Sequence, residues 1–329
     1  MIYKVNAIIT CLLLTCVACS GKSGTKAQTE GEISEALQSA NAGSMEKAPQ
    51  SDDVDSDIKE SVELQMIYAS DDDREIFEKY LVHIEKLESF QESELITETA
   101  RFFLGKPYVA QTLEMEPEGL VVNFRELDCT TFVETVLALS RTVVRYENPT
   151  FDDFCRQLQN IRYRRGTIND YTDRIHYFSD WIYENETRGH VRDVTKEIGG
   201  EPYKVKVNYM SSHPDSYKQL KSNVKYVEAT KKKESEISTR DLYAFIPEAK
   251  IKSCEERMRD GDILCFVTNI EGLDISHVGF VCRDKGEVKF IHASSSEKKV
   301  VVDKLSIRGY VEKSKSVTGV MIVRPRFLI

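Results

Sequence analysis

The sequence has little of what marks several common classes of protein. Its 329 residues include 16 glycines, 8 prolines and a single tryptophan, a composition that fits neither a collagen nor a coiled coil. With 41% hydrophobic and 30% charged residues, the chain as a whole is not disordered either. These absences leave a globular protein, long enough for one large domain or two small ones with a hydrophobic core.

The chain has no net positive charge either. The net charge is −9, and the acidic excess lies in residues 30–73, which hold thirteen Asp or Glu residues against two lysines. The remainder of the chain is therefore close to neutral. Because a protein that binds nucleic acid needs a basic face, we expect no nucleic acid among the partners.

No apolar run near the N-terminus is long enough to cross a bilayer. Residues 7–17 suit the core of a signal peptide, and they end in CVAC, which resembles the cleavage box of bacterial lipoproteins. We expect a lipoprotein signal peptide over residues 1–18 and a lipid on Cys19; an ordinary secretory signal cut near Ala18 is the alternative. The chain is then an exported bacterial lipoprotein, anchored to the membrane on the periplasmic side or at the cell surface.

The segment after Cys19 lacks the apolar surface that a core needs. Residues 19–65 are rich in Ser, Gly, Ala, Asp and Glu, and this composition predicts a disordered acidic tether. We expect one catalytic domain over residues 66–329, and we expect it to be a monomer.

Cysteine pairs are also missing from that domain. Its five cysteines, at positions 129, 155, 254, 265 and 282, form no Cys-x-x-Cys pair, which argues against a structural zinc site. We expect no metal and no cofactor. An odd number of cysteines in an exported chain leaves at least one thiol free, and the three late ones stand in apolar surroundings typical of core residues.

The spacing of the apolar residues changes along the domain from helical to strand-like. Helical spacing predicts helices over 72–90, 93–104, 129–146 and 150–162. Short β-branched runs between turn residues predict strands over 262–267, 277–282, 288–293, 299–302 and 319–323. Helices followed by strands predict an α+β fold, with N-terminal helices packed on a small antiparallel sheet.

Cys129 is the residue of most chemical interest. It follows Asp128, a good N-cap, and opens a predicted helix, where unpaired N–H groups and the helix dipole favour a thiolate. Two histidines in predicted strands, His277 and His292, are candidates for its base and for the group that orients the base. We expect a thiolate–imidazolium pair between Cys129 and His277.

Five ordered motifs carry a resemblance to a known family. They are GKPYVAQTLE (105–114), LDCTTFVE (127–134), GDILCFV (261–267), SHVGFV (276–281) and FIHASS (290–295). Together they resemble the NlpC-type superfamily of papain-like cell-wall cysteine peptidases. The resemblance implies a papain-like fold in which Cys129 is the nucleophile, His277 the base, His292 the third polar residue and Tyr108 the active-site tyrosine.

The chain departs from the superfamily pattern in two ways. Gln111 stands where the pattern favours glycine, which puts the geometry of that loop in doubt. The interval between Cys129 and His277 is also far longer than in a minimal member. Its motifs TDRIHYFSDWI (172–182) and MSSHPDSY (210–217) resemble a branch similar to N-acetylmuramoyl-L-alanine amidases, so we expect residues 165–250 to be a substrate-binding insertion.

Several polar and aromatic side chains of the insertion are candidates for contact with a sugar and a carboxylate. Tyr and Trp rings stack on sugars, and Arg holds a carboxylate with two hydrogen bonds. The candidates are Asp173, Arg174, His176, Tyr177, Trp181, Ser211, Ser212 and His213. For Tyr177 and Trp181, simple packing of the inserted helix is an equal alternative.

Three functions stay open at this point. The first is an amidase that cleaves the amide between N-acetylmuramic acid and L-alanine in peptidoglycan fragments, by a Cys-His-His mechanism. The second is a γ-D-glutamyl-diamino acid endopeptidase of the same superfamily. The third is an inactive, lipid-anchored module that binds muropeptides, and an intact set of Cys129, His277 and His292 speaks against it.

Overall fold

The structure is a computed structural model that describes residues 63–87 and 91–327. All the described residues belong to one compact unit, Val62–Ile329. The predicted signal peptide, the lipidation of Cys19 and nearly all of the predicted tether lie outside the described residues. In the described part, no helix combines the length and the apolar character that a membrane span requires.

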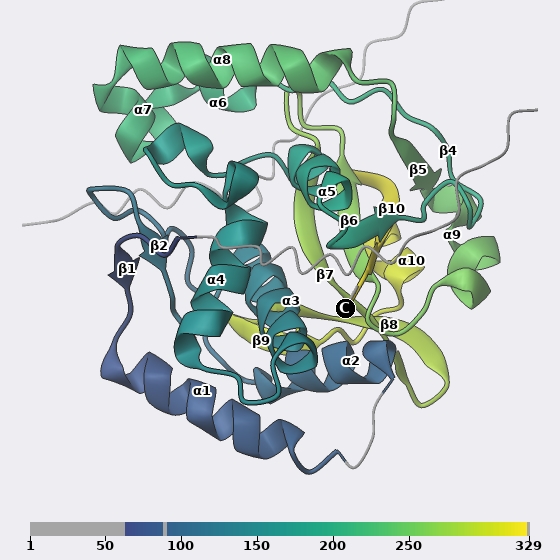
Figure 1. The fold of residues 1–329 in the computed structure, drawn as a ribbon. Coiled ribbons are helices and arrows are strands. Elements are labelled where there is room, and N and C mark those ends of the chain that lie inside the picture. The colour runs from purple at the N-terminus through teal and green to yellow at the C-terminus, as the bar shows by residue number, and fades with distance from the viewer. Residues whose placement is uncertain (1–62, 88–90, 328–329) are drawn as a thin grey trace, which may run out of the picture. The chain divides into compact units, whose positions relative to one another are not determined.

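Four helices and a short strand pair form the N-terminal half of the folded unit (Figure 1). The helices are α1 (Asp71–Ile84), α2 (Glu92–Phe102), α3 (Cys129–Arg145) and α4 (Phe151–Arg162). Strands β1 (Ile67–Tyr68) and β2 (Leu120–Val121) pair in parallel beside them. The four predicted helices are thus present, with α1 ending six residues earlier than its apolar stripe predicts.

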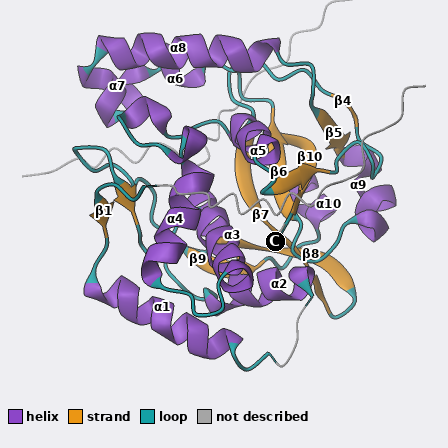
Figure 2. Ribbon diagram, in the orientation of Figure 1, coloured by secondary structure: helices purple, strands orange, loops and turns teal. Residues whose placement is uncertain are grey.

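Most of the C-terminal half is one largely antiparallel sheet, whose strands differ in length (Figure 2). Its strands are β3 (Val191–Asp193), β4 (Glu201–Pro202), β5 (Ala244–Pro247), β6 (Ile263–Thr268), β7 (Ile275–Asp284), β8 (Glu287–Ser294), β9 (Lys299–Val302) and β10 (Val317–Pro325). The order across the sheet is β4-β5-β10-β6-β7-β8-β9, and β3 pairs with β10. The fold is therefore α+β, and all five predicted strands are in place.

Helices cover both faces of this sheet. On one face α3 packs against β7, and Phe132 of α3 meets Phe280 of β7 edge to face with the ring centroids 5.8 Å apart. On the other face α9 (Glu248–Cys254) and α10 (Ile307–Lys313) cover a second apolar cluster around Phe266 and Phe290. Alternate residues of β6, β7 and β8 enter the two cores, so the central strands are buried on both sides.

Between α4 and β5 the chain builds the predicted insertion. Its helices are α5 (Phe178–Thr187), α6 (Tyr209–Ser212), α7 (Lys218–Ser222) and α8 (Val224–Thr239). Short 3₁₀ turns stand at Arg164–Gly166, Tyr171–Asp173 and Pro214–Ser216, and a fourth at Glu255–Arg257 follows α9. Helices α6, α7 and α8 lie together at the top of Figure 1, apart from α1 and α2 at its bottom.

Candidate active site

Cys129 is the first residue of α3, as predicted. Asp128 caps the helix: its Oδ1 accepts a hydrogen bond from the Thr131 backbone N–H at 2.8 Å, and Thr131 Oγ1 accepts one from the Asp128 N–H at 2.9 Å. This reciprocal capping box fixes the backbone on which the thiol is carried. The Cys129 sulfur lies beside the backbone N–H of Val278, the residue that follows His277 in β7.

Three side chains on β7, β8 and the end of β9 form a hydrogen-bonded row. His277 Nε2 lies 2.6 Å from His292 Nδ1, and His292 Nε2 lies 3.1 Å from Asp303 Oδ2. The His292 ring is buried, with 1% of the residue exposed. The structure therefore brings the two predicted histidines together and adds a carboxylate behind them.

The carboxylate determines which nitrogen of each ring carries the proton. Burial by itself raises the pKa of Asp303, but hydrogen bonds from His292 and from the Leu305 backbone N–H lower that pKa below its usual value. An ionised carboxylate only accepts hydrogen bonds, so His292 donates from Nε2 and accepts at Nδ1. His277 then donates from Nε2, which leaves its Nδ1 as the unprotonated nitrogen.

Asp303 was missed by the motif comparison, although the sequence holds a signal for it. His292 pairs with Val301 across β8 and β9, and side chains two residues apart on a strand point to the same face. A carboxylate two residues after Val301 therefore falls on the face of the sheet that His292 occupies.

Tyr108 lies close to Cys129. Its backbone forms a parallel bridge with Leu127, two residues before Cys129. Burial raises the pKa of the Tyr108 hydroxyl, and the charges of Cys129 and Asp128 raise it further. The phenol is thus a neutral hydrogen-bond donor near the sulfur.

The loop with the unusual glutamine keeps the backbone that a glycine would favour. Gln111 has φ of 63°, in the left-handed region, where a residue with a side chain costs about 1–2 kcal/mol. Gln111 therefore adds a side chain to this loop, while its backbone keeps the left-handed conformation that a glycine would favour.

Burial works against the predicted ion pair. Burial raises the pKa of the Cys129 thiol to about 12, and the Asp128 charge adds to this effect, while the Val278 N–H and Thr130 oppose it. Burial, helped by His292, lowers the pKa of His277 to about 3, against the influence of Asp303. Desolvation therefore favours a thiol and a neutral imidazole, whereas the N-terminus of α3 favours the thiolate.

The insertion is fastened at the end of the sheet where His277 lies. The Tyr209 backbone N–H donates to Gly272 O at 3.0 Å, and the Ser179 N–H donates to Asp274 Oδ2 at 2.7 Å. Both acceptors belong to the turn that leads into β7, three to five residues before His277.

A second tie joins the insertion to the loop ahead of Cys129. Lys218, the first residue of α7, lies 3.5 Å from Glu116 through Nζ and Oε1. The insertion is therefore tied both to the β6–β7 turn and to the 109–118 loop.

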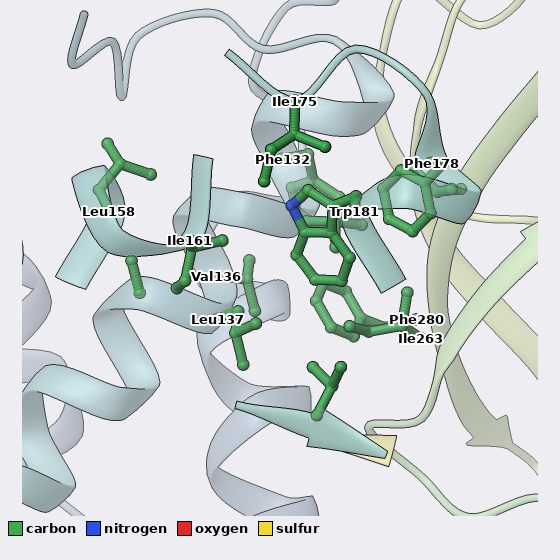
Figure 3. Close-up of a cluster of buried hydrophobic side chains, with 14 of the residues drawn as sticks. Phe132, Val136, Leu137, Leu158, Ile161, Ile175, Phe178, Trp181, Ile263 and Phe280 are labelled. Atoms are coloured by element: carbon green, nitrogen blue, oxygen red, sulfur yellow. The ribbon is translucent and has the colours of Figure 1, made fainter. Parts of the chain in front are cut away.

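Two of the aromatic candidates are core residues, which corrects their predicted role in sugar binding. Trp181 is 1% exposed and stacks on Phe178, and Figure 3 shows it enclosed by apolar side chains of the core. Tyr177 is buried, and its hydroxyl donates to Glu234 at 2.7 Å while accepting the Met210 backbone N–H at 2.9 Å. Neither ring has a free face.

Arg174 is also occupied inside the protein. It lies 3.2 Å from Glu114 through Nη2 and 3.4 Å from Glu118 through Nε, and its guanidinium stands over the Tyr171 ring. Its predicted role as a ligand for a substrate carboxylate is therefore wrong, because two protein carboxylates already hold a buried cation.

Asp173 and His176 border a hollow of about 270 Å³ on the insertion. The Asp173 carboxylate caps the turn before it and accepts from the Asn169 N–H at 2.8 Å. His176 Nε2 lies 3.1 Å from Tyr171 O, and burial lowers the pKa of this imidazole well below its usual value. His176 is neutral and fixed.

The serine and histidine candidates lie on α6 and directly after it. Ser212 and His213 are exposed, Ser211 is half-buried, and the His213 ring stacks on Tyr209. Since Tyr209 binds the turn before His277, these three residues stand at the edge of the site, and their contact with substrate stays a prediction.

Among residues 63–87 and 91–327, no cluster of His, Cys, Asp and Glu has the arrangement of a metal site. All five cysteines of the folded unit are free, and Cys155, Cys254, Cys265 and Cys282 are buried, which confirms the three late ones as core residues.

Comparison with known proteins agrees with this geometry. A search of the curated proteins gave no match, but residues 98–320 match the family model described as N-acetylmuramoyl-L-alanine amidase-like. A crystal structure of an N-acetylmuramoyl-L-alanine amidase from Bacteroides uniformis is 37% identical, with a TM-score of 0.69 over 72% of this chain and 100% of that one.

Two further structures are similar. A Bacteroides fragilis protein provisionally called a xylanase is 38% identical, with a TM-score of 0.66 over 69% of this chain and 99% of its own. A Legionella pneumophila protein shares the fold at 22% identity, with a TM-score of 0.58 over 77% of this chain and 93% of that one. The matched residues include α3, the histidine strands and the insertion between them, and the chain belongs to the N-acetylmuramoyl-L-alanine amidase-like family.

Proposed function

We propose that the protein is a cysteine amidase of papain-like fold that hydrolyses the amide between N-acetylmuramic acid and L-alanine in peptidoglycan fragments. The family and the named relatives support a cell-wall amidase. The Cys-His-His mechanism and the choice of bond are our assignment to this chain.

One observation carries the mechanism. The row from Asp303 through His292 to His277 leaves Nδ1 of His277 as the free base, and His277 directly precedes the residue whose N–H meets the Cys129 sulfur. A thiol hydrolase needs a nucleophile, a base and a group that orients the base. Cys129, His277 and His292 take these roles in turn.

The reaction starts from neutral groups. As the Cys129 sulfur attacks the lactyl carbonyl of the muramic acid, its proton passes to His277 Nδ1, and the carbonyl oxygen becomes an oxyanion. Collapse of this intermediate breaks the C–N bond, and His277 returns the proton to the leaving alanine nitrogen. The Cys129 thioester that remains is hydrolysed by water with His277 again as base, which releases the sugar acid and restores the thiol.

Two donors are placed to stabilise the oxyanion. The backbone N–H of Cys129 stands at the N-terminus of α3, where N–H groups have no helical partner. The neutral Tyr108 hydroxyl near the sulfur is the second. Donors in a site of this kind are worth about 10²–10³ in rate each.

The alternatives fit less well. A glycosidase needs two free carboxyl groups across the scissile bond, but here Asp128 caps α3 and Asp303 binds His292. An inactive binding module would not need the hydrogen-bonded row of Asp303, His292 and His277, which sets the tautomer of His277. The γ-D-glutamyl-diamino acid endopeptidase would use the same chemistry on a different bond, so only the products distinguish it.

We further propose that the protein works as a monomeric lipoprotein attached through Cys19, on the periplasmic side or at the cell surface. This rests on the N-terminal sequence, which ends in CVAC and is followed by an acidic tether. It would place the enzyme where peptidoglycan fragments are available.

The test is the mass of the products from the full-length protein and two defined substrates, a muramyl tripeptide and the same tripeptide without the sugar. We expect free N-acetylmuramic acid and an intact peptide from the first, and no cleavage of the second. A shortened peptide from the sugar-free substrate would establish the endopeptidase instead. No product from either substrate would rule out both hydrolases.

A further inference from the structure

A second hollow, of about 290 Å³, lies where the loop before Cys129 meets the insertion. Glu116 and Glu118 line it from the loop, Asp170 from the start of the 3₁₀ turn at Tyr171–Asp173, and Gln219 and Tyr226 from α7 and α8. It is distinct from the Cys129 and His277 centre; the chain runs from Glu118 through β2 to Cys129, which is 11 residues later. No mechanistic role described above uses it.

The wall of this hollow holds a buried amide that lacks a partner. Gln219 is 5% exposed, and neither its Nε2 nor its Oε1 has a hydrogen-bond partner among the described residues. The same holds for Oε2 of Glu118, whose side chain is 5% exposed. An unsatisfied buried polar group costs about 1–3 kcal/mol. Gln219 Oε1 and Glu118 Oε2 are acceptors that a ligand with N–H groups would satisfy, whereas Gln219 Nε2 is a donor and needs an acceptor from the ligand.

The charge of the wall favours a cation. Three carboxylates line the hollow, and of the described residues that line it none is Lys, Arg or His. The positively charged side chains next to the hollow already form ion pairs: Arg174 with Glu118 and Glu114, and Lys218 with Glu116. Burial raises the pKa of Glu118, against the influence of Arg174, so its charged form gains from a further cation.

The aromatic side of the hollow suits the stem of such a cation. The Tyr226 ring is half-buried in the lining and stacks on Tyr171 with the centroids 6.1 Å apart, while Tyr171 itself is buried beneath Arg174. An alkyl chain that ends in an ammonium packs its methylenes on rings while its head meets carboxylates and ring faces. A neutral sugar would satisfy the amide but add no positive charge beside the three carboxylates.

We infer that this hollow, which we call the Gln219 hollow, binds the primary ammonium of an aminoalkyl group. Given the proposed function, on which this assignment rests, the group is the side-chain amine of the diamino acid in the stem peptide. Its position beside the 109–118 loop then lets the enzyme select fragments by a residue of the peptide that it does not cut.

The test compares two muramyl tripeptides that end in lysine, one with a free side-chain amine and one with that amine acetylated. With the full-length protein, we expect kcat/KM for the free amine to be about tenfold higher, which corresponds to 1.4 kcal/mol. Gln219→Met and, separately, Glu118→Gln should reduce this preference to about threefold or less. The exposed Lys221→Met on the same helix is the matched control and should keep it.

A substitution at the rim of the hollow should raise the preference for the free amine instead of lowering it. Lys218→Met removes the cation beside Glu116 and should increase the preference for the free amine two- to threefold, by Coulomb attraction across a solvated distance. Equal kcat/KM for the two substrates would overturn the inference, as would a preference that both Gln219→Met and Glu118→Gln leave intact.

A binding measurement separates this inference from the proposed function. The Cys129→Ala variant is titrated with the free and the acetylated tripeptide, both without sugar, by calorimetry. Tighter binding of the free amine, lost in the Cys129→Ala, Gln219→Met double variant, supports the hollow even if no substrate is cleaved. Equal binding, together with normal cleavage by the unchanged protein, refutes the hollow and leaves the amidase in place.

Discussion

His277 and His292 are joined through their ring nitrogens, Nε2 to Nδ1 at 2.6 Å, on the neighbouring strands β7 and β8. The rings stand nearly perpendicular, at 83°, and both lie against the Tyr310 ring. Through this contact Asp303, which is hydrogen-bonded to the His292 ring, also sets which nitrogen of His277 is unprotonated.

Asp303→Asn should damage the enzyme more than Asp303→Ala. The asparagine amide can donate to His292 Nε2, which reverses both hydrogen bonds and puts a proton on Nδ1 of His277. We expect kcat/KM to fall by about 10²–10⁴ for the asparagine variant, as befits a wrong tautomer, and by about 10–100 for alanine. Equal losses in the two variants would contradict the tautomer argument; thermal unfolding checks that both fold.

The pH profile of kcat/KM reports the resting charge state. Because burial lowers the pKa of His277 to about 3 and raises that of Cys129 to about 12, neither group of the free enzyme titrates near neutrality. We expect kcat/KM to be constant from about pH 5 to pH 9. In Asp303→Ala the fall of kcat/KM on the acid side should occur at a still lower pH, since Asp303 raises the pKa of His277. An acid limb near pH 6.5 would indicate an ordinary, solvated imidazole.

His190 should make the fold sensitive to acid. It is 2% exposed, and burial, together with Arg141, Arg188 and Arg145, lowers its pKa to about 2. The unfolded chain takes up a proton near pH 6.5 and the folded one does not, so stability is full above pH 6.5 and is lost as pH falls toward 2.

The size of that loss is measurable by denaturant unfolding. Between pH 7 and pH 5 this single histidine should account for about 2 kcal/mol of the free energy of unfolding. His190→Phe should remove that share of the pH dependence, and His213→Gln, at an exposed position, should not. A His190→Phe protein with an unchanged slope would show that His190 is protonated in the fold.

Trp181 should prove structural. We expect Trp181→Ala to cost about 3–5 kcal/mol of unfolding free energy, as for other large core side chains, and Trp181→Phe to cost less while keeping the KM for a muramyl tripeptide. A rise in KM for Trp181→Phe, with stability unchanged, would restore a sugar-binding role to this ring.

The regular elements could be predicted from the sequence because each carries its own periodic signal. The helix of Cys129 begins directly after its capping residue, Asp128, and β9 spans the predicted 299–302. The candidate nucleophile Cys129 and the two histidines were identified through ordered motifs. Asp303 was not, because its role depends on the register between β8 and β9, which no single segment encodes.

The insertion was harder to predict for a physical reason. Arg174 and Tyr177 are residue types that often bind ligands. Here Arg174 forms an ion pair with Glu118, and Tyr177 donates a hydrogen bond to Glu234. Whether a polar side chain faces a ligand or a protein partner depends on contacts far apart in sequence, so local composition does not decide it.

The central claim is tested most directly by the mass of the enzyme during turnover. A muramyl tripeptide is mixed with excess full-length protein, the reaction is quenched with acid, and the adduct is weighed and located by peptide mapping. We predict a thioester of the N-acetylmuramic acid acyl group on Cys129, absent from Cys129→Ala, which should release no peptide. An adduct with the mass of a peptide acyl group, an adduct on another residue, or full turnover by Cys129→Ala would contradict the account.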